Sequence, residues 1–281
     1  MDRLPTSSTR LACVLGHPVA HSVSPQMHNA AFAEAGIDAV YVALDISPDD
    51  IAQAVAGLGA LGVLGVNVTV PHKRAVWELA QRRAPEAEAV GAANTLWWED
   101  GLLVADNTDA PALVEMFQAE VGLTAGDPVL LFGAGGAARA AAVALGRAEA
   151  SVKVVARQAE AAATVAELAA ASGAEATAYG TDQLSEVLAD ASVVVNATSL
   201  GLAGERLADP LMALRGDQIA VDLIYGRSET PFLLAARSAG AAAHDGLSML
   251  VGQAALSFER WTGVPAPVET MRAAARAALG R

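Results

Sequence analysis

Cysteine and aromatic residues are scarce in this chain. Its 281 residues include one cysteine, Cys13, and aromatic side chains make up 4% of the total. One cysteine excludes an internal disulfide and a cluster of thiolate metal ligands. Because Cys13 lies within the apolar run 11–15, we expect a packed core thiol rather than a reactive one. Hydrophobic residues still reach 53%, much of it alanine, which suits helices packed closely on a sheet.

Basic charge and long apolar segments are scarce as well. Lys and Arg number 18 against 31 Asp and Glu, which gives a net charge of −13. This balance argues against a nucleic-acid partner, but a cleft can still attract a small anionic substrate. The longest apolar run, 54–66, is interrupted by glycines and too short to span a bilayer. We expect no signal peptide, no membrane contact and a cytoplasmic location.

The first hundred residues alternate predicted strands and helices. Strands are expected at 11–15, at 40–46 and up to residue 70, with a hairpin at 95–98 and 102–105. Helices are expected from Ser24, as a cap followed by Pro25, to about residue 36, after Ser47-Pro48-Asp49-Asp50, and over 76–82.

A second alternating series follows Asp109, whose helix is expected to run to about residue 121. Strands are predicted at 128–132, 151–155, 176–179, 192–197 and 218–223, mostly separated by alanine-rich helices. This rhythm predicts a parallel, doubly wound sheet. The stretch from residue 246 is expected to be helical, with a break at 263–267.

The segment 65–73 brings an amide, a hydroxyl and an amine to the end of an apolar run. Asn67 and Thr69 precede Pro71, and Lys73 follows it. A strand end that opens into a helix is where α/β proteins usually place ligands. Alternatively, Asn67 and Thr69 cap the turn and Lys73 is solvated. The segment alone leaves both interpretations open.

A glycine-rich loop follows the predicted strand 128–132. Gly133-Ala134-Gly135-Gly136-Ala137 opens a helix within a βαβ unit, which is the context of a dinucleotide-binding loop. The next predicted strand is followed by Arg157, with no acid before Glu160. An arginine here favours the 2′-phosphate of NADP over the ribose hydroxyl of NAD, although Arg157 could also be a solvated surface residue.

Further short motifs recur in a fixed order along nearly the whole chain. They are Gly16-His17-Pro18, His21-Ser22-Val23-Ser24-Pro25, His28-Asn29, Asn67-Val68-Thr69 with Lys73, Ala93-Asn94-Thr95, Asn107-Thr108-Asp109, the glycine loop, Asn196-Ala197-Thr198-Ser199, Asp222 with Tyr225, and Gly246 through Gln253. Together they resemble the shikimate dehydrogenase family. Each motif is ordinary alone, and their number and order make the resemblance specific.

The resemblance implies an α/β fold with two domains. Residues 1–106 with 246–281 would form an N-terminal α/β substrate-binding and catalytic domain, to which the C-terminal helices return. Residues 107–245 would form a doubly wound, Rossmann-type domain that binds NADP, with NAD also possible. The implied activity is the reversible, NADP-dependent reduction of 3-dehydroshikimate to shikimate, a step of aromatic amino-acid biosynthesis. Family members occur as monomers and as homodimers.

The resemblance also implies roles for individual residues. Lys73 and Asp109 would be catalytic, with Lys73 relaying the hydroxyl proton and Asp109 orienting it. The substrate would be held by Ser22, Ser24, Thr69, Asn94, Asp109, Tyr225 and Gln253. The cofactor would be held by Gly133, Ala134, Gly135, Gly136, Ala137, Arg157, Thr198, Leu223, Gly246 and Met249. No metal is expected, because His17, His21 and His28 have no matching carboxylates.

Several positions depart from the family pattern, and two alternatives stay open. The departures are Ala112, Ala156, Gln158, Arg227, Ser248 and Gly252. They allow a quinate/shikimate dehydrogenase-like paralogue that uses NAD or both cofactors, although Ser24 and the missing acid near Arg157 favour the shikimate enzyme. The other alternative is a ligand sensor without turnover, which the presence of both Lys73 and Asp109 opposes.

Overall fold

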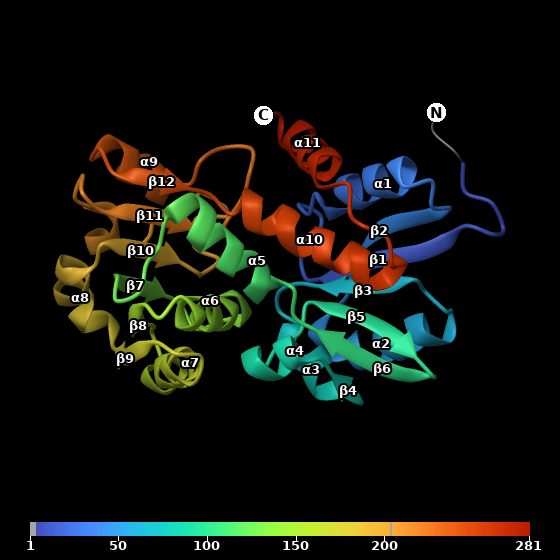
Figure 1. Cartoon of the computed structure of the whole chain (residues 1–281), viewed down its shortest axis with the longest axis horizontal. Helices are drawn as coiled ribbons and strands as arrows, with labels where there is room; N and C mark the ends of the chain where they lie inside the picture. Colours follow the sequence, from blue (N-terminus) through green and yellow to red (C-terminus); the bar gives the residue numbers. More distant parts are fainter. Residues whose placement is uncertain (1–3, 203) are drawn as a thin grey trace. The chain divides into compact units, whose positions relative to one another are not determined.

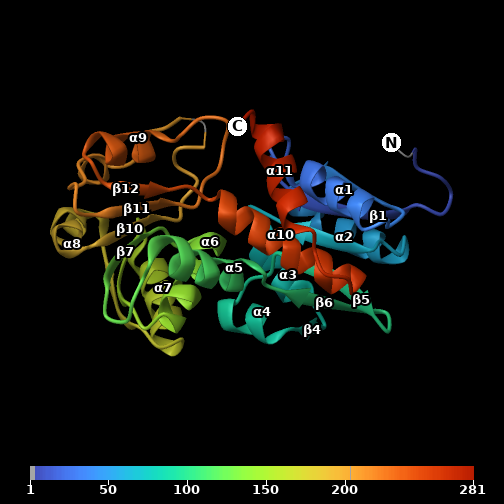
Figure 2. The same ribbon diagram turned by 45° about the horizontal axis from the view of Figure 1, so that its top comes forward.

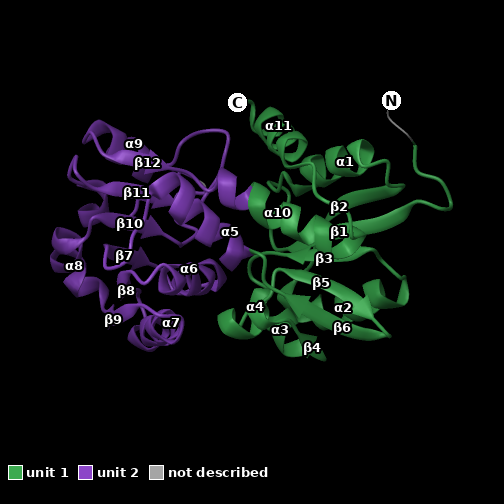
Figure 3. Ribbon diagram, viewed as in Figure 1, with its two compact units in different colours: residues 1–108, 251–281 green, residues 109–250 purple. Residues whose placement is uncertain are grey.

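A computed structural model describes residues 4–202 and 204–281 as an α/β protein (Figure 1). The chain divides into two compact units, Met1–Thr108 with Val251–Arg281 and Asp109–Leu250 (Figure 3). Within the described residues, each unit contains one six-stranded sheet. None of the described helices is long and apolar enough to cross a membrane.

The first unit has a mixed sheet in the order β2-β1-β3-β5-β6-β4. Its strands are β1 (Arg10–Gly16), β2 (Ala39–Asp45), β3 (Gly65–Val68), β4 (Arg82–Arg83), β5 (Thr95–Glu99) and β6 (Leu102–Asp106). β1 pairs in parallel with β2 and β3, whereas β5 is antiparallel to β3 and β6. The carboxyl ends of β1, β2 and β3 therefore meet at one edge.

Helices cover both faces of this first sheet. They are α1 (Ser24–Glu34), α2 (Ile51–Ala60) after a short 3₁₀ turn (Pro48–Asp50), α3 (Lys73–Leu79), α4 (Pro85–Val90), α10 (Leu247–Thr262) and α11 (Val268–Leu279). Cys13, Val66 and Leu96 of the sheet form a core with Val55 of α2 and Val76 of α3. Figures 1 and 2 both show α11 beside α1. Cys13 is fully buried, as expected, and burial raises its pKa to about 12.

The second unit has an entirely parallel sheet in the order β12-β11-β10-β7-β8-β9. Its strands are β7 (Pro128–Phe132), β8 (Ser151–Val155), β9 (Glu175–Tyr179), β10 (Val193–Asn196), β11 (Ile219–Asp222) and β12 (Ala242–His244). The order reverses between β7 and β10, which is the switch point where doubly wound sheets bind ligands. The predicted parallel sheet is confirmed.

The helices of the second unit connect these strands. They are α5 (Asp109–Met116), continued by a π-helical turn (Phe117–Val121), α6 (Gly136–Arg147), α7 (Ala159–Ala171), α8 (Leu184–Asp190) and α9 (Pro231–Ser238), with 3₁₀ turns at Thr181–Gln183 and Asp209–Met212. Phe132 and Val194 of the sheet pack with Leu184 of α8 and Phe232 of α9. The expected helix from residue 109 to about 121 is confirmed.

The prediction of a helix over 76–82 is wrong at its end. α3 stops at Leu79, and Arg82–Arg83 form the short strand β4 beside β6. The Arg83 Nε donates to the Trp77 carbonyl at 2.8 Å, so the side chain satisfies a carbonyl near the helix end. The following Pro85 also keeps Ala84 extended, with ψ of 157°.

The expectation that Ser24 caps α1 is also wrong. Ser24 is the first helical residue and the N-cap is Val23, whose side chain makes no cap hydrogen bond. The hydroxyl of Ser22 instead accepts a hydrogen bond from the Ser24 backbone N–H at 3.3 Å. Pro25 lies in the first turn as expected, because its missing N–H costs nothing there.

Candidate active site and cofactor site

The loops that follow β1 and β3 run together at the carboxyl edge of the first sheet. The Thr69 N–H donates to the Leu15 carbonyl at 2.8 Å, and the His17 N–H donates to the Val70 carbonyl at 3.0 Å. Ser22 and Ser24 follow β1, so they belong to the same edge as Thr69. Ser24 is buried, whereas Ser22 and Thr69 are half-buried.

Lys73 begins α3 and is tied through its backbone to the segment before β5. The Lys73 carbonyl accepts a hydrogen bond from the Ala93 N–H at 2.8 Å. The residue after Ala93 is Asn94, whose carbonyl accepts a hydrogen bond from the Val68 N–H at 2.8 Å. The structure thus brings Lys73 and Asn94 onto neighbouring segments. The Lys73 side chain is half-buried.

The Asn94 and Gln253 side chains meet within a buried network of neutral groups. Asn94 Nδ2 donates to Gln253 Oε1 at 3.3 Å and to Thr108 Oγ1 at 2.9 Å. Its Oδ1 accepts from the Thr108 N–H at 2.8 Å and from the Thr95 hydroxyl at 3.1 Å. Both ends of the Asn94 amide are therefore oriented by fixed partners.

Asn67 is the hub of the same network rather than a cap of the turn. Its Oδ1 accepts from the Tyr41 hydroxyl at 2.7 Å, and its Nδ2 donates to Ser257 Oγ at 2.9 Å and the Asn94 carbonyl at 3.1 Å. Ser257 lies on α10, so this bond attaches α10 to β3. Gly65 permits the approach, because a Cβ there would overlap the ring of Trp261, also on α10.

The histidines of the described chain do not come together as a metal centre. His17 Nδ1 lies 2.6 Å from Asp45 Oδ1 at the surface, and His21 is exposed. His28 is fully buried and stacks on the Tyr41 ring with centroids 4.3 Å apart. Burial lowers the pKa of His28 to about 3, although the neighbouring Asn67 side chain acts to raise it. Among the described residues no group of three or more His, Cys, Asp or Glu could hold a metal.

The glycine loop of the second unit lies at the switch point between β7 and β10. Gly133 has φ of +124°, and a Cβ there would lie 2.9 Å from the Ala197 carbonyl oxygen in the loop after β10. Gly135 is the N-cap of α6, with open space where a Cβ would stand. Ala138 is fully buried, as a small residue in helix–strand packing should be. The loop therefore leaves room for a pyrophosphate at the helix start.

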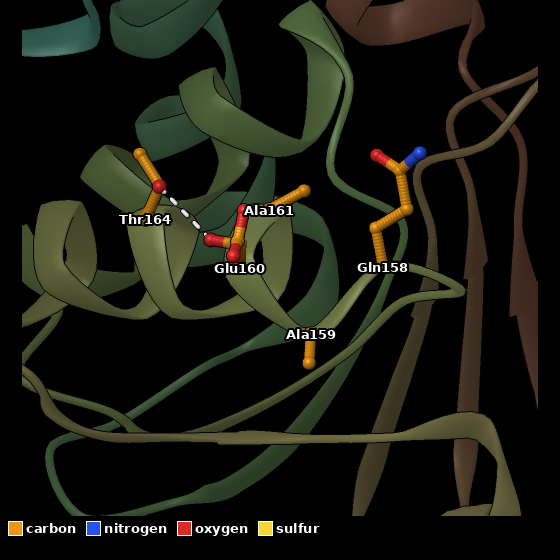
Figure 4. Close-up of a pocket in the computed structure, with 5 residues that line it drawn as sticks. All are labelled: Gln158, Ala159, Glu160, Ala161 and Thr164. Carbon is orange, nitrogen blue, oxygen red and sulfur yellow. Dashed lines mark hydrogen bonds between the residues drawn. The ribbon is translucent and has the colours of Figure 1, made fainter.

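Arg157 is exposed two residues after the end of β8 and one residue before the N-cap of α7. An open pocket lies at the start of α7 (Figure 4). It is lined by Gln158, Ala159, Glu160, Ala161 and Thr164. Glu160 is exposed too, so the charge that this lining carries is acidic.

Three loops after β10, β11 and β12 carry the remaining candidates of the second unit. Thr198 follows β10, Leu223 and Tyr225 follow β11, and Gly246 follows β12. The Gly246 N–H donates to the Ile224 carbonyl at 3.1 Å, and a Cβ at Gly246 would overlap the Leu223 carbonyl.

The predicted site residues divide between the two units. Ser22, Ser24, Thr69, Lys73, Asn94 and Gln253 belong to the first unit, and Asp109, Tyr225, Arg157, Thr198, Leu223, Gly246, Met249 and the glycine loop belong to the second. Asp109 begins α5 and is 2% exposed. Met249 is buried in the first turn of α10.

Sequence reasoning assigned no role to several members of these networks. Thr95 and Thr108 lie inside recognised motifs, and Ser257 follows Gln253 by four residues, a spacing that places both on one helix face. That spacing could have identified Ser257. Tyr41 gives no such signal, because nothing local indicates that its hydroxyl reaches Asn67.

A parallel sheet with a glycine loop at its switch point defines the class of dinucleotide-binding α/β proteins. Comparison with known proteins narrows the class. Residues 14–96 match the family model of the shikimate dehydrogenase substrate binding domain, and residues 246–276 match that of the shikimate 5′-dehydrogenase C-terminal domain. The chain belongs to the shikimate dehydrogenase family.

Relatives match over nearly the full length of the chain. Shikimate dehydrogenase (NADP(+)) of Anaeromyxobacter sp. (strain K) is 47% identical over 98% of this chain and 99% of its own. Shikimate dehydrogenase from Aquifex aeolicus has a TM-score of 0.87 and 33% identity over 97% of this chain and 100% of its own. The Thermus thermophilus enzyme, solved with NADP(H) and shikimate, has a TM-score of 0.83 and 36% identity, covering 96% and 100%.

Proposed function

We propose that this protein is an NADP-dependent shikimate dehydrogenase that reversibly reduces 3-dehydroshikimate to shikimate in aromatic amino-acid biosynthesis. The observation that carries the proposal is the buried network that holds the amides of Asn94 and Gln253 together on segments tied to Lys73. Neutral donors of this kind suit the hydroxyl groups of a small polyol acid. The full-length relatives named for this activity support the same conclusion.

The first unit would bind the substrate. Ser22 and Ser24 would hold the carboxylate together with Thr69, because Ser22 and Thr69 lie in the segments that follow β1 and β3 and Ser24 begins the next helix, α1. Asn94 and Gln253 would bind ring hydroxyls. From the second unit, Asp109 would bind an adjacent hydroxyl and Tyr225 would lie beside the carboxylate.

The second unit would bind the cofactor. The open space at Gly135 and the helix start at Gly136 fit a pyrophosphate, with Gly133, Ala134 and Ala137 completing the loop. Arg157 would pair with the 2′-phosphate, while Thr198, Leu223, Gly246 and Met249 would adjoin the nicotinamide half. NAD could occupy the same loop without the contact to Arg157.

The cofactor, when bound, would supply the hydride as NADPH in the reduction and accept it as NADP+ in the oxidation. Lys73 would donate a proton to the developing alkoxide during reduction and take it back during oxidation. Asp109 would orient the Lys73 ammonium and the neighbouring hydroxyl. This division gives the chemical step to Lys73 and leaves binding to the other groups.

The functional domains follow from these assignments. Residues 1–106 with 246–281 would be the substrate-binding and catalytic domain, and residues 107–245 the NADP-binding domain. The compact units change at Thr108 and Val251, so the proposed functional boundaries differ from them by a few residues. The protein would act in the cytoplasm as a monomer or a homodimer, on a small-molecule substrate.

Initial rates with four substrate pairs would test the proposal. Shikimate or quinate would be combined with NADP+ or NAD+, and reduced nicotinamide would be followed by its absorbance. We expect shikimate with NADP+ to give the highest kcat/KM. A higher value with quinate or NAD+ would assign the protein to the other branch of the family. Ligand-induced thermal stabilisation without any turnover would instead indicate a sensor.

A further inference from the structure

A buried carboxylate in the second unit has no part in the proposed chemistry. Asp222 ends β11, is fully buried, and accepts three hydrogen bonds. Thr230 Oγ1 donates to its Oδ2 at 2.6 Å, whereas Asn196 Nδ2 and the Ile224 N–H donate to its Oδ1 at 2.9 and 3.2 Å. Because burying a carboxylate is costly, these three partners indicate a specific role at this strand end.

The bond to Asn196 extends the network into the loop after β10. Asn196 Oδ1 accepts from the backbone N–H of Thr198 at 3.1 Å and from its hydroxyl at 2.7 Å. The Thr198 hydroxyl in turn accepts from the Leu200 N–H at 3.1 Å. Asp222 thus fixes the Asn196 amide, which fixes the turn that presents Thr198.

The bond to Thr230 closes the loop after β11 at its base. Thr230 is the N-cap of α9, where its hydroxyl also accepts from the Leu233 N–H at 3.3 Å. The closed loop, 223–229, contains Leu223 and Tyr225. The Gly246 segment after β12 packs on it through the hydrogen bond to Ile224. Asp222 therefore joins the loops after β10 and β11 directly, and the loop after β12 is attached to them through Ile224.

We propose that Asp222 is a positioning residue that fixes the loops after β10, β11 and β12 and so aligns the nicotinamide half of the bound cofactor. The inference rests on the proposed function, since it takes the cofactor to be NADP. Arg157 follows β8, which is separated from β10 by β7 in the sheet order. The adenosine half therefore binds on the other side of the switch point and does not depend on Asp222.

Two ligands separate positioning from general support of the fold. NADP+ spans both halves of the site, whereas adenosine 2′,5′-bisphosphate occupies the adenosine half alone. Thr230→Val removes the bond to Asp222 and the cap bond from the Leu233 N–H with little change in side-chain volume, and Thr230→Ser restores the hydroxyl for both. Asp222→Ala removes all three bonds. Thr124→Val is the matched control, because Thr124 Oγ1 donates to Asp127 Oδ2 at 2.9 Å before the amino end of β7.

We expect Thr230→Val to raise the Kd of NADP+ roughly tenfold, the loss of one charge-assisted hydrogen bond, with a larger rise in Asp222→Ala. The Kd of adenosine 2′,5′-bisphosphate should stay within about twofold of wild type in Thr230→Val. Thr230→Ser should bind NADP+ like wild type, and Thr124→Val should change neither constant.

Three outcomes would contradict the inference. Equal losses for both ligands in Thr230→Val would show general disruption of the unit, and no loss for either would show that the bond has no positioning effect. Failure of Thr230→Ser to restore NADP+ binding would remove the hydroxyl from the explanation. Absence of NADP+ binding by the wild-type protein would overturn the proposed function itself, so the two failures are distinguishable.

Discussion

The two units place their candidate residues by different kinds of polar network. In the first unit, Asn67, Asn94 and Ser257 exchange hydrogen bonds among neutral amides and hydroxyls. In the second unit, the network centres on one ionisable group, Asp222. The groups of the neutral network do not change charge at moderate pH, so their hydrogen bonds persist. A buried carboxylate can take up a proton, so its charge depends on the pH.

This difference follows from the hydrogen-bonding groups of the two central side chains, Asn67 and Asp222. Asn67 can orient its neighbours because an amide has a donor end and an acceptor end, and the Tyr41 hydroxyl determines which end faces β2. Asp222 only accepts, so it can gather three donors, one from the end of β10 and two from the segment between β11 and α9. The amide network in the first unit can orient the side chains proposed to bind the substrate. The carboxylate in the second unit can hold several loops together.

The largest expected effect tests whether the chemical step belongs to the first unit. Lys73→Ala should lower kcat by about 10²–10⁴-fold, the usual value of a positioned proton-transfer group, and change KM little. NADP+ binding should persist, because the proposed cofactor groups lie in the other unit. Steady-state kinetics of the variant would measure this. Arg74→Ala is the control, since Arg74 is exposed and pairs with Glu78; an unchanged kcat for Lys73→Ala would remove it from the mechanism.

The second prediction tests the cofactor role of the second unit. Arg157→Ala should raise the KM for NADP+ by roughly 10–100-fold, the value of a hydrogen-bonded charge pair, and leave the KM for NAD+ unchanged. Arg215→Ala serves as a control in the same unit, since Arg215 pairs with Asp217 at the surface. Equal changes for both cofactors would mean that Arg157 does not contact the 2′-phosphate.

The third prediction concerns proton-linked stability in the first unit. Burial lowers the pKa of His28 to about 3, so unfolding takes up a proton below the ordinary pKa of about 6.5. Stability is therefore lost as the pH falls through this window, by about 2 kcal/mol between pH 7 and pH 5. Urea unfolding of wild type and His28→Phe would measure it. An equal loss of stability between pH 7 and pH 5 in both proteins would exclude His28 as the source of the loss.

The fourth prediction has the opposite sign. Burial raises the pKa of Asp222 to about 6, against opposing hydrogen bonds from Thr230, Ile224 and Asn196. The folded protein then binds a proton that the unfolded chain releases, so this group stabilises the fold as the pH falls from 7 to 5, by roughly 1 kcal/mol. Because His28 lowers stability over the same range, the contribution of Asp222 is measured as a difference between the two proteins. Urea unfolding should show that Asp222→Asn loses roughly 1 kcal/mol more stability than wild type between pH 7 and pH 5. An equal change in both proteins would assign the effect to another group.

The smallest expected effect tests the neutral network. Ser257→Ala should lower the free energy of unfolding by about 1 kcal/mol, because Asn67 Nδ2 loses one acceptor while keeping the Asn94 carbonyl. The loss should be equal at pH 5 and pH 7, since no member of the bond titrates there. Chemical denaturation at both pH values would show this, and a pH-dependent loss would break the contrast between the units.

Local patterns predicted most of the strands, because buried parallel strands are continuous apolar runs between glycines and polar turns. The strand 128–132 and the glycine loop after it could be placed by such patterns alone. Arg82–Arg83 could not, because two charged residues carry no strand pattern and pair only through β6. The β12 segment was missed for a similar reason, since it is short and alanine-rich.

The site residues also divide into those that a local pattern could place and those that depend on contacts distant in the sequence. Motif order proposed Lys73, Asn94 and Gln253 as candidates, but the bond between Asn67 and Ser257 joins residues 190 positions apart. No local spacing contains such a contact, because it depends on α10 passing over β3. The capping role expected of Ser24 was wrong for a local reason, since Ser22 supplies its hydroxyl to the same turn.

The division of the chain sets an order of assembly during synthesis. The second unit is one continuous stretch, Asp109–Leu250, whereas the first unit needs Val251–Arg281 to complete it. On the ribosome, the whole second unit emerges before the part of α10 that carries Gln253 and Ser257. The first unit can therefore be completed only after translation has passed through the second unit. Until then, the Asn67 amide lacks its partner on α10.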